Sequence, residues 1–292
     1  MKPRKILAAT DFSECADRAV AAAVGLAQRF SAELHLVHAV EIPVALFEPY
    51  GLGIPTDWIG DARSRAQAKL EETRTRLAGS LDNVALHLEE VPAATAIAAC
   101  AGAIGADWVV VGTHGRTGIP HLLLGSAAER TAREAPCDVL VVRGESGPLE
   151  GSAPIVVGVD FSEPSQRAAL CAAELARVTG ARLVLVHALD LGMPLVTAYD
   201  VSVPQPVIDE ARAAAQARLD TLSSELGDGI DVTLEIARTA ASDALIEAAE
   251  AAGADLIVTG SRGLGGLKRI LLGSVAERTL RTAPCSVLTV KR

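Results

Sequence analysis

The chain contains two copies of one sequence about 150 residues apart, and this duplication constrains its architecture more than any other feature. Residues 11–40 match residues 160–189 at 15 of 30 positions, and residues 107–143 match residues 255–291 at 20 of 37 positions. A repeat of this length is the size of a whole domain and is too long for a solenoid. The sequence therefore predicts a first domain over 1–143, a linker over 144–153 and a second domain over 154–292.

Within each copy, short aliphatic runs alternate with long alanine-rich stretches. In the first copy, strands are expected at 5–10, 33–39, 84–91, 107–111 and 138–142, and helices at about 13–29, 61–81, 93–104 and 126–134. Runs such as 108–111 are apolar without alternation, as strands buried on both faces require. The pattern predicts an α/β fold with two repeated open parallel five-stranded sheets, each covered by helices on both faces in a Rossmann-like sandwich.

The charge and the aromatic content argue against nucleic-acid binding. The net charge is −9, and no basic face that would displace counterions from phosphates stands out. Aromatic residues make up 3% of the chain, which is too few for a base-stacking platform. We therefore expect no nucleic-acid partner.

The chain also lacks the marks of export and membrane insertion. No apolar run approaches the ~20 residues of a membrane span, and only four apolar residues, 6–9, follow the basic N-terminus. The five cysteines are widely spaced and form no CxxC, so they indicate neither a disulfide framework nor a zinc site. We expect a cytoplasmic protein without a membrane partner.

A glycine-rich motif follows the fourth strand in both copies. The first copy has Gly112-Thr-His-Gly115, nine residues, then Gly125-Ser126, and the second has Gly260-Ser-Arg-Gly263, nine residues, then Gly273-Ser274. Glycines after a strand allow positive φ angles and a close approach of ligand to backbone. A Gly-Ser pair at a helix start would present N–H groups and the positive end of the helix dipole to a phosphate.

The same residues have purely structural interpretations. Ser126 with Glu129, and Ser274 with Glu277, each fit a capping box that satisfies a helix N-terminus. Asp11 and Asp160, each at the end of a first strand, fit N-cap or Asx-turn positions. Ser13 and Ser162 fit N-caps, and His38 and His187 are expected to close the second strand of each copy.

The joint pattern resembles the ATP-binding type of universal stress protein domain. That family's signature is Gly-x2-Gly-x9-Gly-Ser/Thr together with an Asp that ends strand one, and both copies match it. The Asp-Phe-Ser start, the His that ends strand two and the closing Ala-Pro-Cys-x-Val-Leu resemble the family too. The resemblance covers essentially the whole chain outside the linker.

This resemblance implies ATP as ligand, accompanied by Mg²⁺, and a binding role for residues of both copies. Asp11 and Asp160 would lie by the adenine and ribose, and Ala39 and Ala188 would contact the base through their backbones. The ribose and phosphates would be held by Gly112, Gly115, Gly125, Ser126 and Ala127, and in the second copy by Gly260, Gly263, Gly273, Ser274 and Val275. The two copies differ in the nine-residue loops, where Arg116 and His121 stand in one copy and Lys268 and Arg269 in the other.

Three functions remain open at this point. The first is a nucleotide-dependent sensor or regulator of the stress response that hydrolyses ATP slowly at most, and therefore not a committed enzyme. The second is a hydrolase or transferase that uses nucleotides. It would require a substrate pocket, for which the only sizeable extra segments are the apolar loops 41–60 and 189–205; these loops could instead cover the nucleotide or form an interface. The third is a dimerisation module that binds nothing, although intact glycines in both copies argue against it.

The family resemblance also implies how copies meet. Single-domain members commonly pair through their last strand, so residues 139–142 and 287–290 are expected to pair antiparallel within this chain. An apolar edge strand without a partner would be prone to aggregation, which favours pairing of some kind. A further homodimer stays open.

Overall fold

The computed structural model describes residues 2–41, 56–81, 83–115, 124–144, 152–189, 203–263 and 272–291. The chain divides into two compact units, Pro3–Gly147 and Pro148–Arg292, which we call unit one and unit two. Several sequence predictions lie outside the described residues: most of the linker, most of the two apolar loops, and Arg116, His121, Lys268 and Arg269.

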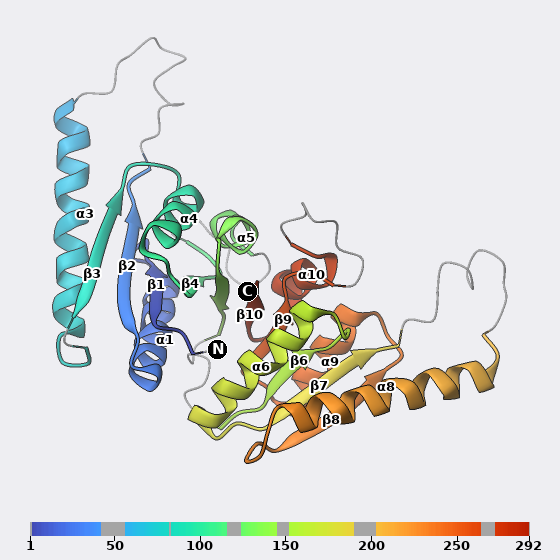
Figure 1. Cartoon of the computed structure of the whole chain (residues 1–292). Coiled ribbons are helices and arrows are strands. Elements are labelled where there is room, and N and C mark those ends of the chain that lie inside the picture. Colours follow the sequence, from blue (N-terminus) through green and yellow to red (C-terminus); the bar gives the residue numbers. More distant parts are fainter. Residues whose placement is uncertain are drawn as a thin grey trace, which may run out of the picture. The chain divides into compact units, whose positions relative to one another are not determined.

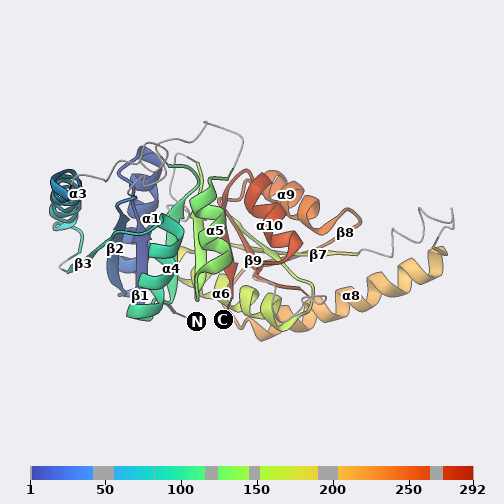
Figure 2. The ribbon, with the colours of Figure 1, turned by 90° about the horizontal axis from the view of Figure 1, so that it is seen from above.

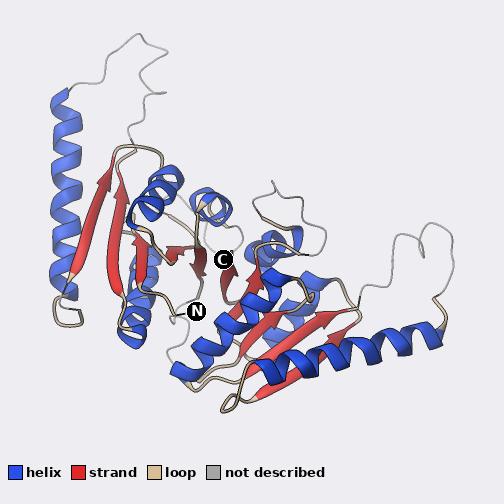
Figure 3. Ribbon diagram, viewed as in Figure 1, coloured by secondary structure: helices blue, strands red, loops and turns tan. Residues whose placement is uncertain are grey.

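Each unit contains one five-stranded sheet with helices on both faces, as the sequence predicts (Figure 1, Figure 3). In unit one the strands are β1 (Lys5–Ala9), β2 (Glu33–Ala39), β3 (Val84–Glu89), β4 (Trp108–Gly112) and β5 (Asp138–Val142). The helices are α1 (Glu14–Phe30), α3 (Thr56–Leu77), α4 (Ala93–Ile104) and α5 (Ser126–Glu134). The strand order is β3-β2-β1-β4-β5 and all pairs are parallel.

Unit two repeats this arrangement. Its strands are β6 (Ile155–Gly158), β7 (Leu183–Ala188), β8 (Val232–Ala237), β9 (Leu256–Gly260) and β10 (Ser286–Val290). Its helices are α6 (Glu163–Thr179), α8 (Gln205–Glu225), α9 (Ala241–Ala252) and α10 (Ser274–Thr282). The order β8-β7-β6-β9-β10 is again parallel throughout.

Helices cover each sheet in pairs. In unit one, Arg76 of α3 forms an ion pair with Asp17 of α1 at 3.3 Å, so these two helices share a face. Helices α4 and α5 lie side by side on the other face (Figure 1, Figure 2). In unit two, Arg177 of α6 donates to the carbonyl of Leu226 at the end of α8, and α9 packs beside α10. Strands such as β4 are therefore buried on both sides.

The ends of the first helix in each unit follow from local chemistry. The hydroxyl of Ser13 accepts from the N–H of Ala16, and that of Ser162 accepts from the N–H of Ser165, which confirms both serines as N-caps. Helix α6 ends at Gly180 with φ of 74°, a left-handed conformation that glycine adopts without strain. The two N-cap serines, Ser13 and Ser162, fix where the chain turns from the carboxyl ends of β1 and β6 into the first helix of each unit.

All five thiols are free, and four are buried. Burial, together with the charge of Glu89, raises the pKa of the Cys100 thiol to about 11, so this thiol stays protonated at neutral pH. Among the described residues, no helix is long and apolar enough to cross a bilayer.

A pair of histidines occupies strands β2 and β3 of unit one. His35 Nδ1 lies 3.0 Å from His87 Nε2, and the two rings stack with centroids 5.3 Å apart. Burial lowers the pKa of both histidines, and for His87 the charge of His35 lowers it further. Glu33 opposes the shift at His35 and Glu89 opposes it at His87, but burial is the larger cause in each case.

Because of this histidine pair, we expect the stability of unit one to fall at acidic pH. Because the folded pKa values lie below the ordinary histidine pKa of 6.5, the unfolded chain binds more protons than the folded chain as the pH falls through that value, and the free energy of unfolding falls with it. We expect a lower melting temperature at pH 5.5 than at pH 7.5. In His35→Val, which installs the residue that unit two carries as Val184, this difference should shrink by at least half. If the melting temperature of the variant depended on pH as strongly as that of the parent protein, the histidine pair would not be the cause of the acid sensitivity.

Candidate functional site

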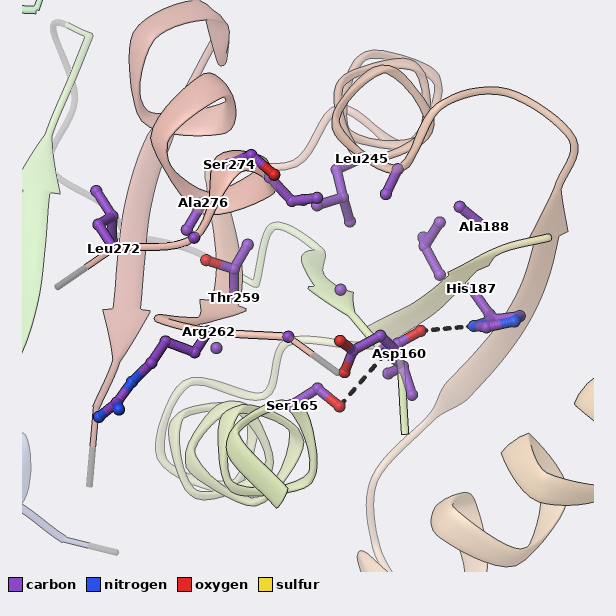
Figure 4. Close-up of a pocket in the computed structure, with 18 residues that line it drawn as sticks. Asp160, Ser165, His187, Ala188, Leu245, Thr259, Arg262, Leu272, Ser274 and Ala276 are labelled. Carbon is purple, nitrogen blue, oxygen red and sulfur yellow. Dashed lines mark hydrogen bonds between the residues drawn. The ribbon is translucent and has the colours of Figure 1, made fainter. Parts of the chain in front are cut away.

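Each unit has a cavity at the carboxyl ends of its strands, and all the predicted site residues line these two cavities. The cavity of unit one has a volume of about 870 Å³ and that of unit two about 500 Å³. The first is lined by Asp11, Ala39, Gly112, Gly115, Gly125, Ser126 and Ala127, and the second by Asp160, Ala188, Gly260, Gly263, Gly273, Ser274 and Val275. Figure 4 shows the second cavity, between α9, α10 and the ends of the strands.

Three motif glycines, Gly112, Gly125 and Gly260, are required by close packing rather than by positive φ. We expected left-handed backbone here, yet no signature glycine has a φ in that region. A Cβ on Gly112 would lie 2.9 Å from the carbonyl oxygen of Cys15, and one on Gly125 would lie 2.8 Å from that of Thr113. In unit two a Cβ on Gly260 would lie 2.9 Å from the carbonyl carbon of Pro164. The fold itself therefore demands glycine at these positions.

This packing weakens one argument from the sequence. In the sequence, intact glycines argue against a module that binds nothing, because a loop without a ligand would not need them. Because Gly112 and Gly260 pack against the first turn of α1 and α6, they would be needed with or without a ligand. The glycines alone do not distinguish a binding site from a structural motif.

The capping-box interpretation of the last helix in each unit is wrong. The N-cap residues are Gly125 and Gly273, which have no side chain that could cap the helix. Ser126 and Ser274 are instead the first helical residues. Glu129 pairs with Arg133 at 3.3 Å and Glu277 with Arg281 at 3.2 Å, one turn further along each helix. The first residues of α5 and α10 thus line the cavities behind a glycine N-cap, an arrangement suited to an anion.

The strand-one aspartates combine the structural role with a place in the cavity. Asp11 Oδ1 accepts from the N–H of Ser13 at 3.1 Å and from its hydroxyl at 2.6 Å, and Asp160 Oδ1 holds Ser162 in the same way. Oδ2 of each carboxylate faces the glycine loop, where a Cβ on Gly115 would lie 2.7 Å away and one on Gly263 2.5 Å. The Asx-turn geometry therefore aims the second oxygen toward the loop.

One pair of cavity residues, His38 and His187, was assigned only a structural role from the sequence, and the phenylalanines on which they pack received no role. His38 Nδ1 and His187 Nδ1 each lie 2.7 Å from a backbone carbonyl oxygen at the end of strand one, as expected for residues that close the second strand. Both rings also line a cavity and pack on Phe12 and Phe161. These phenylalanines have a φ of 63°, which is unusual for a bulky side chain and is repeated in both units.

Two buried polar atoms at the cavities have no hydrogen-bond partner among the described residues. They are His114 Nε2 in unit one and Thr259 Oγ1 in unit two. A buried polar atom without a partner costs free energy, so each of these atoms gains if a ligand or water supplies one. They differ between the copies, because Arg262 stands in place of His114 and Val111 in place of Thr259. In Figure 4 the Arg262 side chain extends away from Asp160 and His187.

Comparison with known proteins now identifies the fold. The model of the universal stress protein family matches the chain twice, over residues 2–143 and 152–291. The chain belongs to the universal stress protein family. A universal stress protein of Mycolicibacterium smegmatis is 28% identical over 295 residues, which cover 98% of this chain and 96% of that protein.

Further relatives agree with this tandem universal stress protein. One of Mycobacterium tuberculosis (strain H37Rv) is 32% identical over 190 residues, covering 64% of this chain and only 62% of the relative. The chain therefore aligns with less than two thirds of that relative. A solved universal stress protein from Archaeoglobus fulgidus matches with a TM-score of 0.71 at 19% identity, over 100% of both chains. The full-length match confirms the α/β fold.

The described residues of this universal stress protein include no ready-made metal cage. Among the described residues, no group of three or more His, Cys, Asp or Glu side chains could hold a metal ion. A Mg²⁺ ion would then need oxygen ligands from a bound phosphate chain, as magnesium commonly does in nucleotide sites. In each cavity the glycine loop and the start of the last helix, which we call the phosphate cradle, lie with one aspartate. This arrangement fits a Mg²⁺ ion whose ligands would come mainly from the phosphates.

Proposed function

We propose that each unit of this universal stress protein binds one molecule of ATP with Mg²⁺, and that the chain acts in the cytoplasm as a nucleotide-dependent sensor or regulator of the stress response. One observation carries the proposal: in both units a helix N-terminus with a glycine N-cap, a glycine loop and an aspartate line the same cavity at the carboxyl ends of the strands. Open parallel α/β sheets bind their ligands at this edge.

The lining residues divide naturally between the two ends of a nucleotide. The N–H groups and hydroxyls at the start of α5 and α10 would hold the phosphates, since they combine donors with the positive end of a helix dipole. Asp11 and Asp160 would accept from ribose hydroxyls. The backbones of Ala39 and Ala188, at the ends of β2 and β7, would contact the base. Bound Mg²⁺ would neutralise charge on the phosphate chain.

The same geometry argues for slow hydrolysis or none. Oδ1 of Asp11 already accepts two hydrogen bonds from Ser13, and His38 Nδ1 is engaged with a backbone carbonyl. A general base must be placed to take a proton from water, and these two groups are held for structural purposes. We therefore expect the bound nucleotide to be retained rather than turned over.

A module that binds nothing is the competing function, and the glycine packing is compatible with it as well as with a binding site. We expect the purified protein, when denatured, to release adenine nucleotide at close to two molecules per chain, measured by chromatography against the protein concentration. Release of about one would mean that a single unit binds. No released nucleotide, combined with no rise in melting temperature on adding Mg-ATP, would refute the proposal and favour the module.

A further inference from the structure

The cavity of unit one is extended by a helix that does not take part in the cavity of unit two. One stripe of α3 lines it through Trp58, Ala62, Arg65 and Lys69, at the spacing of successive turns of one helix face. We call these four residues the α3 face. None of the described residues of α8, the corresponding helix of unit two, lines the smaller cavity.

The sequence of unit two explains the difference. Val207 stands in place of Trp58, and Ala214 in place of Arg65. Arg218 replaces Lys69, but its guanidinium carbon lies 4.0 Å from the centroid of the Phe161 ring. Lys69 Nζ lies 5.4 Å from the Phe12 centroid and borders the cavity. Unit two therefore keeps the cation on the phenylalanine and lacks the indole.

The α3 face lies at the end of the cavity opposite the phosphate cradle. The cradle follows β4, whereas α3 packs on β2 and β3, two and three strands away in the order β3-β2-β1-β4. With about 4.8 Å between neighbouring strands, the two ends are on the order of 10–15 Å apart. A nucleotide whose phosphates lie in the cradle would extend its base toward the α3 face.

We propose that the α3 face is a base-recognition subsite of unit one, at which Trp58 stacks on the purine ring of a nucleotide while Arg65 or Lys69 donates to acceptor atoms on its edge. This inference rests on the proposed function. Unit two lacks the subsite, so the two units bind the same nucleotide with different affinity and different selectivity for the base.

The chemistry of the three side chains selects the class of ligand. The Trp58 side chain is exposed, at 45%, while it lines the cavity, so an aromatic ring can reach its face. Stacking on an indole favours the larger purine ring over a pyrimidine. Arg and Lys carry only donors, which suits the ring nitrogens and carbonyl oxygens of a base edge. The preferred ligand is thus a purine nucleotide.

Titration calorimetry on the full chain, with Mg-ATP and Mg-CTP, tests the subsite. In Trp58→Ala we expect ATP affinity to fall roughly tenfold or more at one of the two sites, with the other site unchanged. The preference for ATP over CTP should fall at the same site. The matched variant Val207→Ala should leave both affinities within about twofold, since Val207 does not line the cavity of unit two.

Intrinsic fluorescence gives a second readout that reports on unit one alone. The chain has 2 Trp, both in unit one, and Trp108 is buried at the start of β4, the end of the strand remote from Gly112. Mg-ATP should therefore quench Trp58 emission and protect it from acrylamide. The conservative variant Trp58→Phe should lose this signal while it keeps most of the affinity.

The outcomes separate this inference from the proposed function. Two calorimetric sites with unchanged Trp58 emission, or equal affinities in Trp58→Ala and the parent protein, would overturn the subsite and leave nucleotide binding intact. Absence of any calorimetric binding would overturn both. Quenching by Mg-ATP that exceeds quenching by Mg-CTP, and that disappears in Trp58→Phe, supports the subsite.

Discussion

Replacing Gly112 with valine is expected to destabilise unit one by about 3 kcal/mol, because the new side chain has no space to occupy. A Cβ at this position would lie 2.9 Å from both the carbonyl oxygen and the Sγ of Cys15, and 3.1 Å from its carbonyl carbon. The oxygen and carbon belong to the backbone of the first turn of α1 and cannot rotate away. Thermal denaturation should show a melting temperature lower by roughly 10 °C.

The control for this variant is a glycine with open space around it. Gly60 lies in α3, and a Cβ there would meet nothing within 4 Å, so Gly60→Ala should stabilise the chain by about 0.5–1 kcal/mol. In unit two Gly260→Val should repeat the loss seen for Gly112→Val, since its Cβ would lie 2.9 Å from Pro164. A Gly112→Val protein as stable as the parent would show that the packing of α1 against β4 adapts.

Replacing Gly115 with valine should remove nucleotide binding from unit one while the fold stays intact. Its Cβ would lie 2.7 Å from Asp11 Oδ2, the far end of a side chain that can move aside. Displacing a carboxylate from a charged hydrogen bond to the ligand should weaken ATP binding by roughly 10- to 100-fold. Calorimetry should show one site lost, and Gly263→Val should remove the other through Asp160.

A double-mutant cycle tests whether the carboxylate is the cause. If Gly115→Val acts by displacing Asp11, then the variant Asp11→Ala should weaken binding to a similar degree and the combined variant should lose little more. If the losses of ATP-binding free energy in the two single variants add up in the combined variant, the valine side chain weakens binding directly and not by displacing Asp11. Full ATP affinity in Gly115→Val would exclude the cavity of unit one as the nucleotide site.

Much of the fold was predictable because strands buried on both faces of a parallel sheet appear in the sequence as continuous apolar runs. The run Val109–Val111 is buried on both faces, and the duplicated motifs place the carboxyl ends of the strands, so the cavity residues were found together. Helix boundaries were less certain. Helix α3 begins at Thr56 and ends at Leu77, whereas the sequence placed it at 61–81, which put Trp58 in a loop.

Contacts between segments distant in sequence could not be predicted. The N-cap at Gly125 rather than Ser126 depends on a hydrogen bond from Gly125 N–H to the carbonyl of Thr113, which no local pattern encodes. The pairing of His35 with His87 depends on the register between β2 and β3. The α3 face emerges only when its helix is placed beside the cavity. The sequence did contain one indication of the α3 face: when the two copies are aligned, Trp58 corresponds to Val207.

Phe12 and Phe161, whose backbones are left-handed, limit how the loop after strand one could change when a ligand binds. A bulky residue held at a φ of 63° persists only where its surroundings determine it fully, here through its packing on His38 or His187. The loop from strand one to the first helix is therefore preorganised, and little conformational entropy is lost there when a ligand arrives. Such a loop holds a ligand without changing shape. A partner that distinguishes the loaded from the empty protein must then read the nucleotide itself or a segment other than this loop.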